Sequence, residues 1–234
     1  MPAALTPARR RGIEHLDDRS MPESVRGRAM ADLVRSNVWF GGARAVTRTL
    51  LPLLRADRSI TMLDVGTGHA DIPRQVRRDA RRRGVSLTVI GADVAASLLR
   101  SALPSLDAAI CGDAVRLPLR DASVDVIVCS QLLHHFDDVG ARGLLAELHR
   151  VSRGWVVISD LQRSWAAAGG FWLGATILRF HPITRHDGVV SVMRGFTSTE
   201  LRRMITESTG ATPTVRRAPF WRLTAVWDTR GAPA

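Results

Sequence analysis

Short apolar runs along residues 58–234 alternate with segments of helical period. The runs predict β-strands, and the amphipathic segments between them predict helices. The expected strands are 60–65, 86–92, 108–111, 124–130 and 155–159, and the expected helices are 72–83, 95–102 and 140–151. Strands that alternate with helices build a mostly parallel sheet with helices on both faces.

The last two apolar runs, 214–219 and 222–227, lie too close together to hold a helix between them. They therefore predict an antiparallel C-terminal hairpin at one edge of the sheet. The complete expectation is an α/β fold with a seven-stranded, mostly parallel sheet, helices on both faces, additional N-terminal helices and a helical cap.

Changes of pattern along the chain predict its domain organisation. Residues 1–22 have no periodicity and predict a flexible N-terminus, and the helical period over 23–57 predicts an N-terminal helical addition. Residues 58–234 form the main domain, with 161–196 as a cap inserted after its fifth strand. Open α/β sheets bind ligands at the carboxyl ends of their strands, so this cap is expected to cover a substrate. Its apolar stretch 165–180 is too short to cross a bilayer, and no membrane span is expected.

The net charge of +11 raises the question of nucleic-acid binding. All 33 basic residues are arginines, which indicates a coding bias more than a binding design. The clusters at 9–11 and 77–83 have no interleaved aromatic residues on which bases could stack. We therefore expect a solvated arginine surface and no nucleic-acid partner.

A glycine turn follows the first predicted strand and has an acid on each side. Asp64 precedes Gly66, Thr67 and Gly68, and a helix is expected to begin a few residues later. Glycines let the backbone approach a ligand closely, and the helix N-terminus presents free amide groups. A dinucleotide site would need a third Gly or Ala where this chain has Asp71, an acid that would repel a pyrophosphate. The turn therefore suits a ligand with a cationic centre, and S-adenosylmethionine fits because its ammonium and sulfonium groups are positive.

Four short motifs resemble those of the class I S-adenosylmethionine-dependent methyltransferases, in particular small-molecule enzymes with a Leu-His-His-Phe sequence. They are residues 63–68, 91–93, 111–114 and 132–136. The resemblance implies a Rossmann-like methyltransferase fold and S-adenosylmethionine as the cofactor. Ala70 departs from the pattern, because many members have glycine at this position.

The resemblance also implies a cofactor role for acids at the ends of three successive strands. Asp64 and the glycine turn would hold the methionine part, and Asp93 would accept hydrogen bonds from both ribose hydroxyls, because a carboxylate offers two oxygens. Asp113 would contact the adenine amino group together with Ala114. The expected cofactor-binding residues are Asp64, Gly66, Thr67, Gly68, Asp93, Val94, Asp113, Ala114 and Ser130. Helix capping is the alternative role for each acid.

His134 and His135 follow the fourth predicted strand, beside the expected position of the methyl group. A phenol has a pKa of about 10, so a neutral histidine is a suitable base near pH 7. In plant-type O-methyltransferases a catalytic histidine is followed by two residues and an acid, and Asp137 and Asp138 stand near that position here. This spacing favours His134 as the base, with packing or hydrogen bonding as the alternative role for both histidines. Two adjacent histidines do not easily face one ion, so no metal site is expected.

Aromatic and polar residues outside the parallel core are the candidates for acceptor binding. Trp39 and Phe40 precede two glycines and predict either a packing corner or a flap over the site. In the cap, His186 and Arg194 could contact a polar substrate group or form an ordinary salt bridge. The expected substrate-binding residues are Trp39, Phe40, Trp165, Phe171, His186 and Arg194.

These features predict an S-adenosylmethionine-dependent methyltransferase that acts on a small, fairly apolar acceptor. O-methylation of a phenolic or polyketide-like hydroxyl is the first expectation, and C-methylation of a quinone-type ring is the close alternative. RNA methylation is a third possible activity, although residues 130–133 lack the Asn/Asp-Pro-Pro-aromatic motif that enzymes methylating amino groups usually have. A cofactor-binding module without turnover is the fourth.

The sequence also suggests a setting and an assembly for the enzyme. Secondary metabolism is the expected context. The polar N-terminus lacks the apolar run of a secretory signal and predicts a cytoplasmic protein. The apolar N-terminal helices could pair in a homodimer or simply pack on the sheet.

Overall fold

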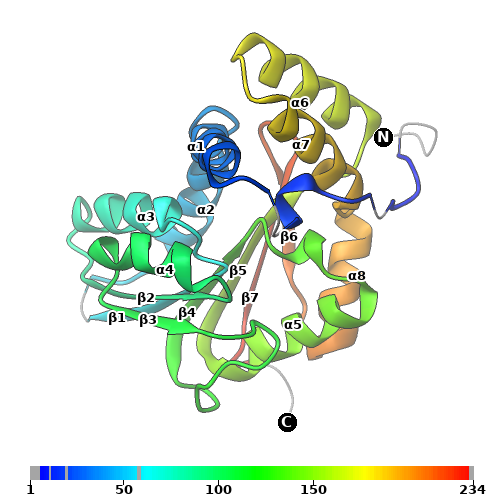
Figure 1. Ribbon diagram of the computed structural model, residues 1–234. Helices are drawn as coiled ribbons and strands as arrows, with labels where there is room; N and C mark the ends of the chain where they lie inside the picture. Colours follow the sequence, from blue (N-terminus) through cyan, green and yellow to red (C-terminus); the bar gives the residue numbers. More distant parts are fainter. Residues whose placement is uncertain (1–5, 11, 19–20, 57–58, 232–234) are drawn as a thin grey trace.

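The computed structural model of this 234-residue protein describes residues 6–10, 12–18, 21–56 and 59–231. The described chain builds one twisted sheet with helices packed against it (Figure 1). The strands are β1 (Ile60–Val65), β2 (Leu87–Asp93), β3 (Ala108–Cys111), β4 (Val124–Ser130), β5 (Ser152–Leu161), β6 (Thr214–Ala218) and β7 (Arg222–Asp228). Within the sheet they follow the order β3-β2-β1-β4-β5-β7-β6.

The pairing of the strands confirms the predicted sheet. Strands β1 to β5 run parallel, and β7 lies antiparallel between β5 and β6. The described residues thus form a seven-stranded, mostly parallel sheet with an antiparallel C-terminal hairpin. The fifth strand is longer than the predicted 155–159, because its outer residues pair with β4 at Ser152 and with β7 at Leu161.

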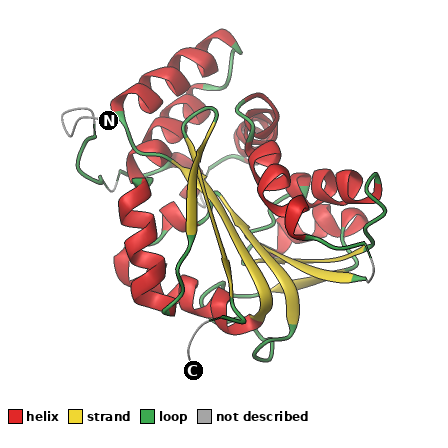
Figure 2. Ribbon diagram, turned by 180° about the vertical axis from the view of Figure 1, so that it is seen from behind, coloured by secondary structure: helices red, strands yellow, loops and turns green. Residues whose placement is uncertain are grey.

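Helices cover both faces of the sheet, as Figure 2 shows. Helices α5 and α8 pack on one face through buried leucines such as Leu144 and Leu201, and α2 and α3 pack on the other through Val46 and Val76. The helices are α1 (Glu23–Trp39), α2 (Gly42–Leu50), α3 (Asp71–Arg81), α4 (Ala96–Ala102), α5 (Asp138–Val151), α6 (Trp165–Ile177), α7 (Pro182–Arg194) and α8 (Ser198–Thr209). Helix α8 was not among the predicted helices, although a capping box between Thr197 and Glu200 fixes its first turn.

The predicted cap segment 161–196 contains α6 and α7, which pack against each other at one end of the sheet (Figure 1). The side chain of Ser164 caps α6, and Pro182 opens α7, where a proline fits the first turn. No helix in the described ranges is both long enough and apolar enough to cross a bilayer.

The described part of the predicted flexible N-terminus makes long-range contacts. The carbonyl oxygen of Pro7 accepts a hydrogen bond from Arg163 Nε at 2.8 Å, and the amide of Leu16 donates to Asp187 at 2.8 Å. The sequence reading of 1–22 did not anticipate this placement, because the partners lie more than 150 residues away and leave no local periodicity.

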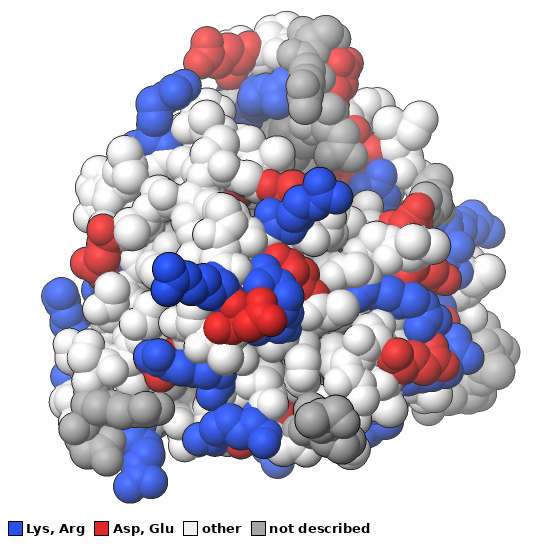
Figure 3. Space-filling view, turned by 90° about the horizontal axis from the view of Figure 1, so that it is seen from below, with Lys and Arg blue, Asp and Glu red and all other residues white. Residues whose placement is uncertain are grey.

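Arginine and acidic side chains alternate on the face of the molecule shown in Figure 3. Described ion pairs include Arg142 with Glu207 and Arg153 with Asp125. These pairs agree with a solvated, partly neutralised surface.

Candidate functional site

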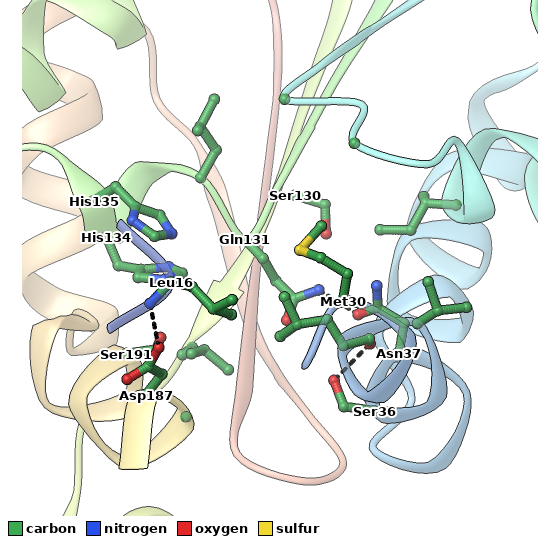
Figure 4. Close-up of a pocket in the computed structure, with 18 of the residues that line it drawn as sticks. Leu16, Met30, Ser36, Asn37, Ser130, Gln131, His134, His135, Asp187 and Ser191 are labelled. Atoms are coloured by element: carbon green, nitrogen blue, oxygen red, sulfur yellow. Dashed lines mark hydrogen bonds between the residues drawn. The ribbon is translucent and has the colours of Figure 1, made fainter. Parts of the chain in front are cut away.

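A cavity of about 550 Å³ opens at the carboxyl ends of β1, β2 and β4. Its other walls come from α1, α6, α7, the described N-terminal residues and the turn between β6 and β7. Figure 4 shows the two sides of the cavity, with His134, His135 and Ser191 on one side and Met30 and Asn37 on the other. Ligands are expected at this edge of an open α/β sheet.

The glycine turn after β1 forms one wall of the cavity. Gly66 and Gly68 have φ angles of 75° and 52°, in the left-handed region that favours glycine. A Cβ at Gly66 would lie 3.0 Å from Leu132 Cδ2, whereas a Cβ at Gly68 would meet open space. The turn therefore exposes bare backbone to the cavity before α3 begins.

Asp93 supports this turn from the end of β2. One carboxylate oxygen accepts a hydrogen bond from the Gly68 amide at 2.9 Å, and the other accepts from the Ala95 amide at 2.9 Å. A carboxylate has about four acceptor positions, so both oxygens can still accept further hydrogen bonds from a ligand.

Asp64 lies on the cavity wall beneath the turn and is buried. Burial, with smaller contributions from the charges of Asp71 and Asp93, raises the pKa of Asp64 to about 7. An unligated Asp64 is therefore partly protonated at neutral pH, and a bound cation would favour its ionised form.

Other polar groups on the cavity wall have unused hydrogen-bonding capacity. Ser130 Oγ and Arg222 Nη1 are buried and have no hydrogen-bond partner among the described residues. Together with the glycine turn and the acids, they fit a polar, zwitterionic ligand such as S-adenosylmethionine.

A chain of side-chain hydrogen bonds connects the N-terminal helix to the glycine turn. Asn37 donates to Asp71 at 2.9 Å and accepts a hydrogen bond from Gln131, whose own amide oxygen accepts from Arg222 at 3.3 Å. Gln131 has a φ of 54°, a strained conformation for a non-glycine residue. Because strain of this kind often occurs at functional sites, Gln131 is a site candidate that the sequence motifs did not single out.

His134 lies on the opposite side of the cavity and is held by Asp160. The distance from His134 Nδ1 to Asp160 Oδ1 is 2.6 Å, and the backbone amide of His134 donates to Asp160 Oδ2 at 3.1 Å. Burial opposes ionisation of Asp160, but His134 and the hydrogen bonds from His134 and Leu161 outweigh it and lower the pKa of the carboxyl. Asp160 is therefore a carboxylate at neutral pH. The predicted acids lie elsewhere, because Asp137 caps α5 and Asp138 pairs with Arg9.

His135 is open to the cavity, with its ring 4.3 Å from that of His134. Protein packed around the ring removes much of its water and lowers the pKa of His135, and the charge of His134 adds to this effect. Ligand atoms of Glu14, His134 and His135 lie within 4.8 Å of one another, close enough to hold a metal ion. Glu14, however, already accepts hydrogen bonds from Ser191 and Arg194. The prediction of no metal site stays a prediction.

Several predicted site residues line the cavity together, and others do not. Those on its wall are Asp64, Gly66, Thr67, Gly68, Asp93, Val94, Ser130, His134, His135, Phe40 and Phe171. Those outside the described lining are Trp39, Trp165, Asp113, Ala114, His186 and Arg194. Three of these have other polar partners: Asp113 accepts from the Val115 amide, Arg194 pairs with Glu14, and His186 lies 2.9 Å from Asp187.

Comparison with known proteins supports the assignment that the geometry suggests. Residues 63–158 match the model of a methyltransferase domain. A comparison with curated protein sequences gives no match.

Similar solved structures span most of the chain. The plantazolicin methyltransferase BpumL, in complex with SAH, has a TM-score of 0.67 at 13% identity, with 92% of both chains covered. A putative O-methyltransferase from Nostoc punctiforme has a TM-score of 0.59 at 16% identity, and this chain covers 60% of its length while 85% of this chain is matched. Magnesium protoporphyrin IX methyltransferase from Synechocystis, with bound SAM, has a TM-score of 0.55 at 10% identity, with 92% of this chain and 88% of that one covered. At these identities the likeness establishes the fold.

The matched domain shows which kind of enzyme the chain contains. Residues 63–158 match a methyltransferase domain, and the protein is an S-adenosylmethionine-dependent methyltransferase. Its cofactor is S-adenosylmethionine.

Proposed function

We propose that this enzyme methylates a hydroxyl oxygen of a small, fairly apolar acceptor, such as a phenol or a polyketide-like alcohol. The observation that carries the proposal is the buried pair of Asp160 and His134, because His134 lies on the wall of the cavity that the glycine turn also lines. Methyl transfer to a hydroxyl is helped by a base that removes the proton, and a histidine hydrogen-bonded to a carboxylate can act as that base.

The hydrogen bonds of Asp160 determine the tautomer of His134. An ionised carboxylate can only accept, so His134 Nδ1 carries a proton and donates a hydrogen bond to Asp160. When the imidazole is neutral, His134 Nε2 is therefore an acceptor. It can take the proton of the acceptor hydroxyl as the oxygen attacks, and Asp160 stabilises the imidazolium that forms.

S-adenosylmethionine, when bound, supplies a methyl group that its sulfonium has already activated. The protein's remaining task is to align the acceptor and remove its proton. We propose that the glycine turn, Asp64 and Asp93 hold the cofactor on the β1–β2 side of the cavity. His134 would then act from the β4 side.

The composition of the cavity supports an acceptor with a large apolar part. Leu33, Phe40, Phe171 and Val192 lie on its walls, beside polar side chains such as Ser191. Pockets of this kind bind ring systems by apolar contact and orient them with a small number of hydrogen bonds.

The test compares His134→Ala with His135→Ala in a labelled methyl-transfer assay against a panel of naphthols and hydroxyflavones. Loss of a general base should reduce turnover of His134→Ala by about 10²–10⁴-fold, with SAH affinity nearly unchanged. His135→Ala should lose far less. Full turnover by His134→Ala would remove it from catalysis, and methylation at ring carbon would favour the C-methyltransferase alternative.

A further inference from the structure

Helix α6 is apolar on every side, yet it lies at the surface. Trp165–Ile177 contains no charged residue, and its inner side packs through Ala167 and Ala168. On the outer side Trp172, Leu173 and Ile177 are 53%, 54% and 70% exposed. A helix without a polar face normally lies inside a protein or in contact with lipid.

Two neighbouring segments extend this apolar surface. The ring of Phe40, at the end of α1, lies 5.3 Å from that of Phe171, and Trp221 contacts α6 so closely that a Cβ at Gly170 would clash with it. We call the combined surface the aromatic face. It consists of the exposed side chains Val38, Trp39, Trp172, Leu173, Ile177, Phe220 and Trp221.

The aromatic face adjoins one side of the cavity. Phe220 and Trp221 belong to the face and also line the cavity. Single exposed apolar residues are common, but a continuous patch of large ones indicates a binding surface.

Positive charge accompanies the aromatic face. Residues 161–186 include no acid. Arg179 follows α6 and is exposed, and Arg217 is exposed beside Phe220 and Trp221. Neither has an ion pair in the part of the chain that the structure describes, whereas arginines such as Arg142 and Arg153 pair with acids.

We propose that the aromatic face docks on the surface of an anionic lipid bilayer. Tryptophan favours the interface between hydrocarbon and headgroups, and apolar side chains next to arginines bind where the headgroups are negative. A second copy of the chain is a poorer occupant, because it would bring the same unpaired arginines against each other on a protein of net charge +11. The docking is independent of the proposed O-methylation, and it would bring the side of the cavity lined by Phe220 and Trp221 close to the bilayer.

The experiment measures binding of the full chain to vesicles by sedimentation. Vesicles of phosphatidylcholine alone are compared with vesicles in which part of the lipid is phosphatidylglycerol. We expect binding to the anionic vesicles only, with salt weakening it.

Substitutions separate the apolar and charged contributions. Trp172→Ser with Leu173→Ser should weaken binding at least about 10-fold, whereas the matched control, Val139→Ser with Leu103→Ser, should not change it. Arg179→Gln with Arg217→Gln should weaken binding by about 25-fold, since each basic group near an anionic surface contributes a factor of about five. Arg83→Gln, another exposed arginine, is the control for charge.

Three results of the vesicle experiment would overturn the proposal: no binding to anionic vesicles, equal binding to neutral vesicles, or unchanged binding by the Trp172 and Leu173 variant. A wild-type dimer in sedimentation velocity that this variant converts to a monomer, without any vesicle binding, would also overturn it. Thermal unfolding and SAH titration verify that each variant is folded. Quenching of wild-type tryptophan fluorescence by brominated anionic lipid gives a second readout that needs no substitution, and its absence would equally refute docking.

Discussion

The replacement Asp64→Asn should make the protein more stable and, at the same time, a weaker binder of its cofactor. Burial raises the pKa of Asp64 from 3.8 to about 7. Between these two values the folded protein keeps a proton that the unfolded chain releases, so the free energy of unfolding falls as pH rises through this window. Above pH 7 the protein is destabilised by the full free-energy cost of ionising buried Asp64.

The magnitude follows from the pKa shift. About three pKa units correspond to about 4 kcal/mol, which is an upper limit because the neighbouring acids titrate together with Asp64. Asparagine has nearly the same shape and cannot ionise. If half of the limit is realised, about 2 kcal/mol, the midpoint of thermal unfolding at pH 8 should rise by roughly 4–8 °C. At pH 5 the difference should be only about a third as large, because only the part of the window between 3.8 and 5 then contributes.

Cofactor affinity should change in the opposite direction. A charge-assisted hydrogen bond contributes about 1.5–3 kcal/mol, so Asp64→Asn should bind SAH at least about 10-fold more weakly at pH 8. Because ionised Asp64 is the binding form, wild-type affinity should rise about 10-fold between pH 6 and pH 8, and this slope should be absent in the variant. The ligand's own amino group titrates equally in both titrations and cancels in the comparison.

The assay combines scanning calorimetry at pH 5 and pH 8 with calorimetric SAH titration. Asp121→Asn is the control, because Asp121 is 76% exposed and its surface pair with Arg150 contributes at most about 1 kcal/mol. Lower stability of Asp64→Asn at pH 8, or equal SAH affinity of variant and wild type, would refute the reasoning.

Three further predictions concern the rest of the cavity. Asp93→Ala should weaken SAH binding by about 10-fold or more in the same titration, since it loses a charge-assisted acceptor and the support of the Gly68 amide; unchanged affinity would remove Asp93 from the site. Asp160→Asn should reduce turnover by about 100-fold or more, because an amide can donate to His134 Nδ1 and leave the proton on Nε2; a wild-type pH–rate profile would contradict this. Removal of divalent metals with EDTA should leave turnover unchanged, and loss that zinc restores would instead assign a metal to Glu14, His134 and His135.

The parallel core could be predicted because its signals are local. Strand β4, whose residues are all buried, is apolar except for Asp125 and Ser130, and the turn at Gly66 and Gly68 interrupts the pattern where the chain must bend. Since parallel strands end at the same edge of the sheet, the positions of Asp64 and Asp93 followed from the strand assignments alone.

The partners of the histidines could not be predicted in this way. Asp160 lies 26 residues from His134 and near the end of β5, so only the pairing of β4 with β5 brings the two together. The spacing rule pointed to Asp137, which instead caps the next helix. Glu14 reaches the cavity from a segment without periodicity, and its contacts with Ser191 and Arg194 show where it lies.

Helix α6 shows a different limit of sequence patterns. Periodicity identifies the buried side of a helix by contrast with a polar side, and Trp165–Ile177 provides no such contrast. The sequence alone therefore allowed a buried helix, an interfacial helix or a lid. The structure supplies the missing asymmetry, because Ala167 and Ala168 are buried while Trp172 and Leu173 are exposed. Large apolar side chains such as Trp172 and Trp221 are therefore exposed in the folded chain, next to the cavity. Because folding does not bury this surface, we infer that a lipid bilayer covers it.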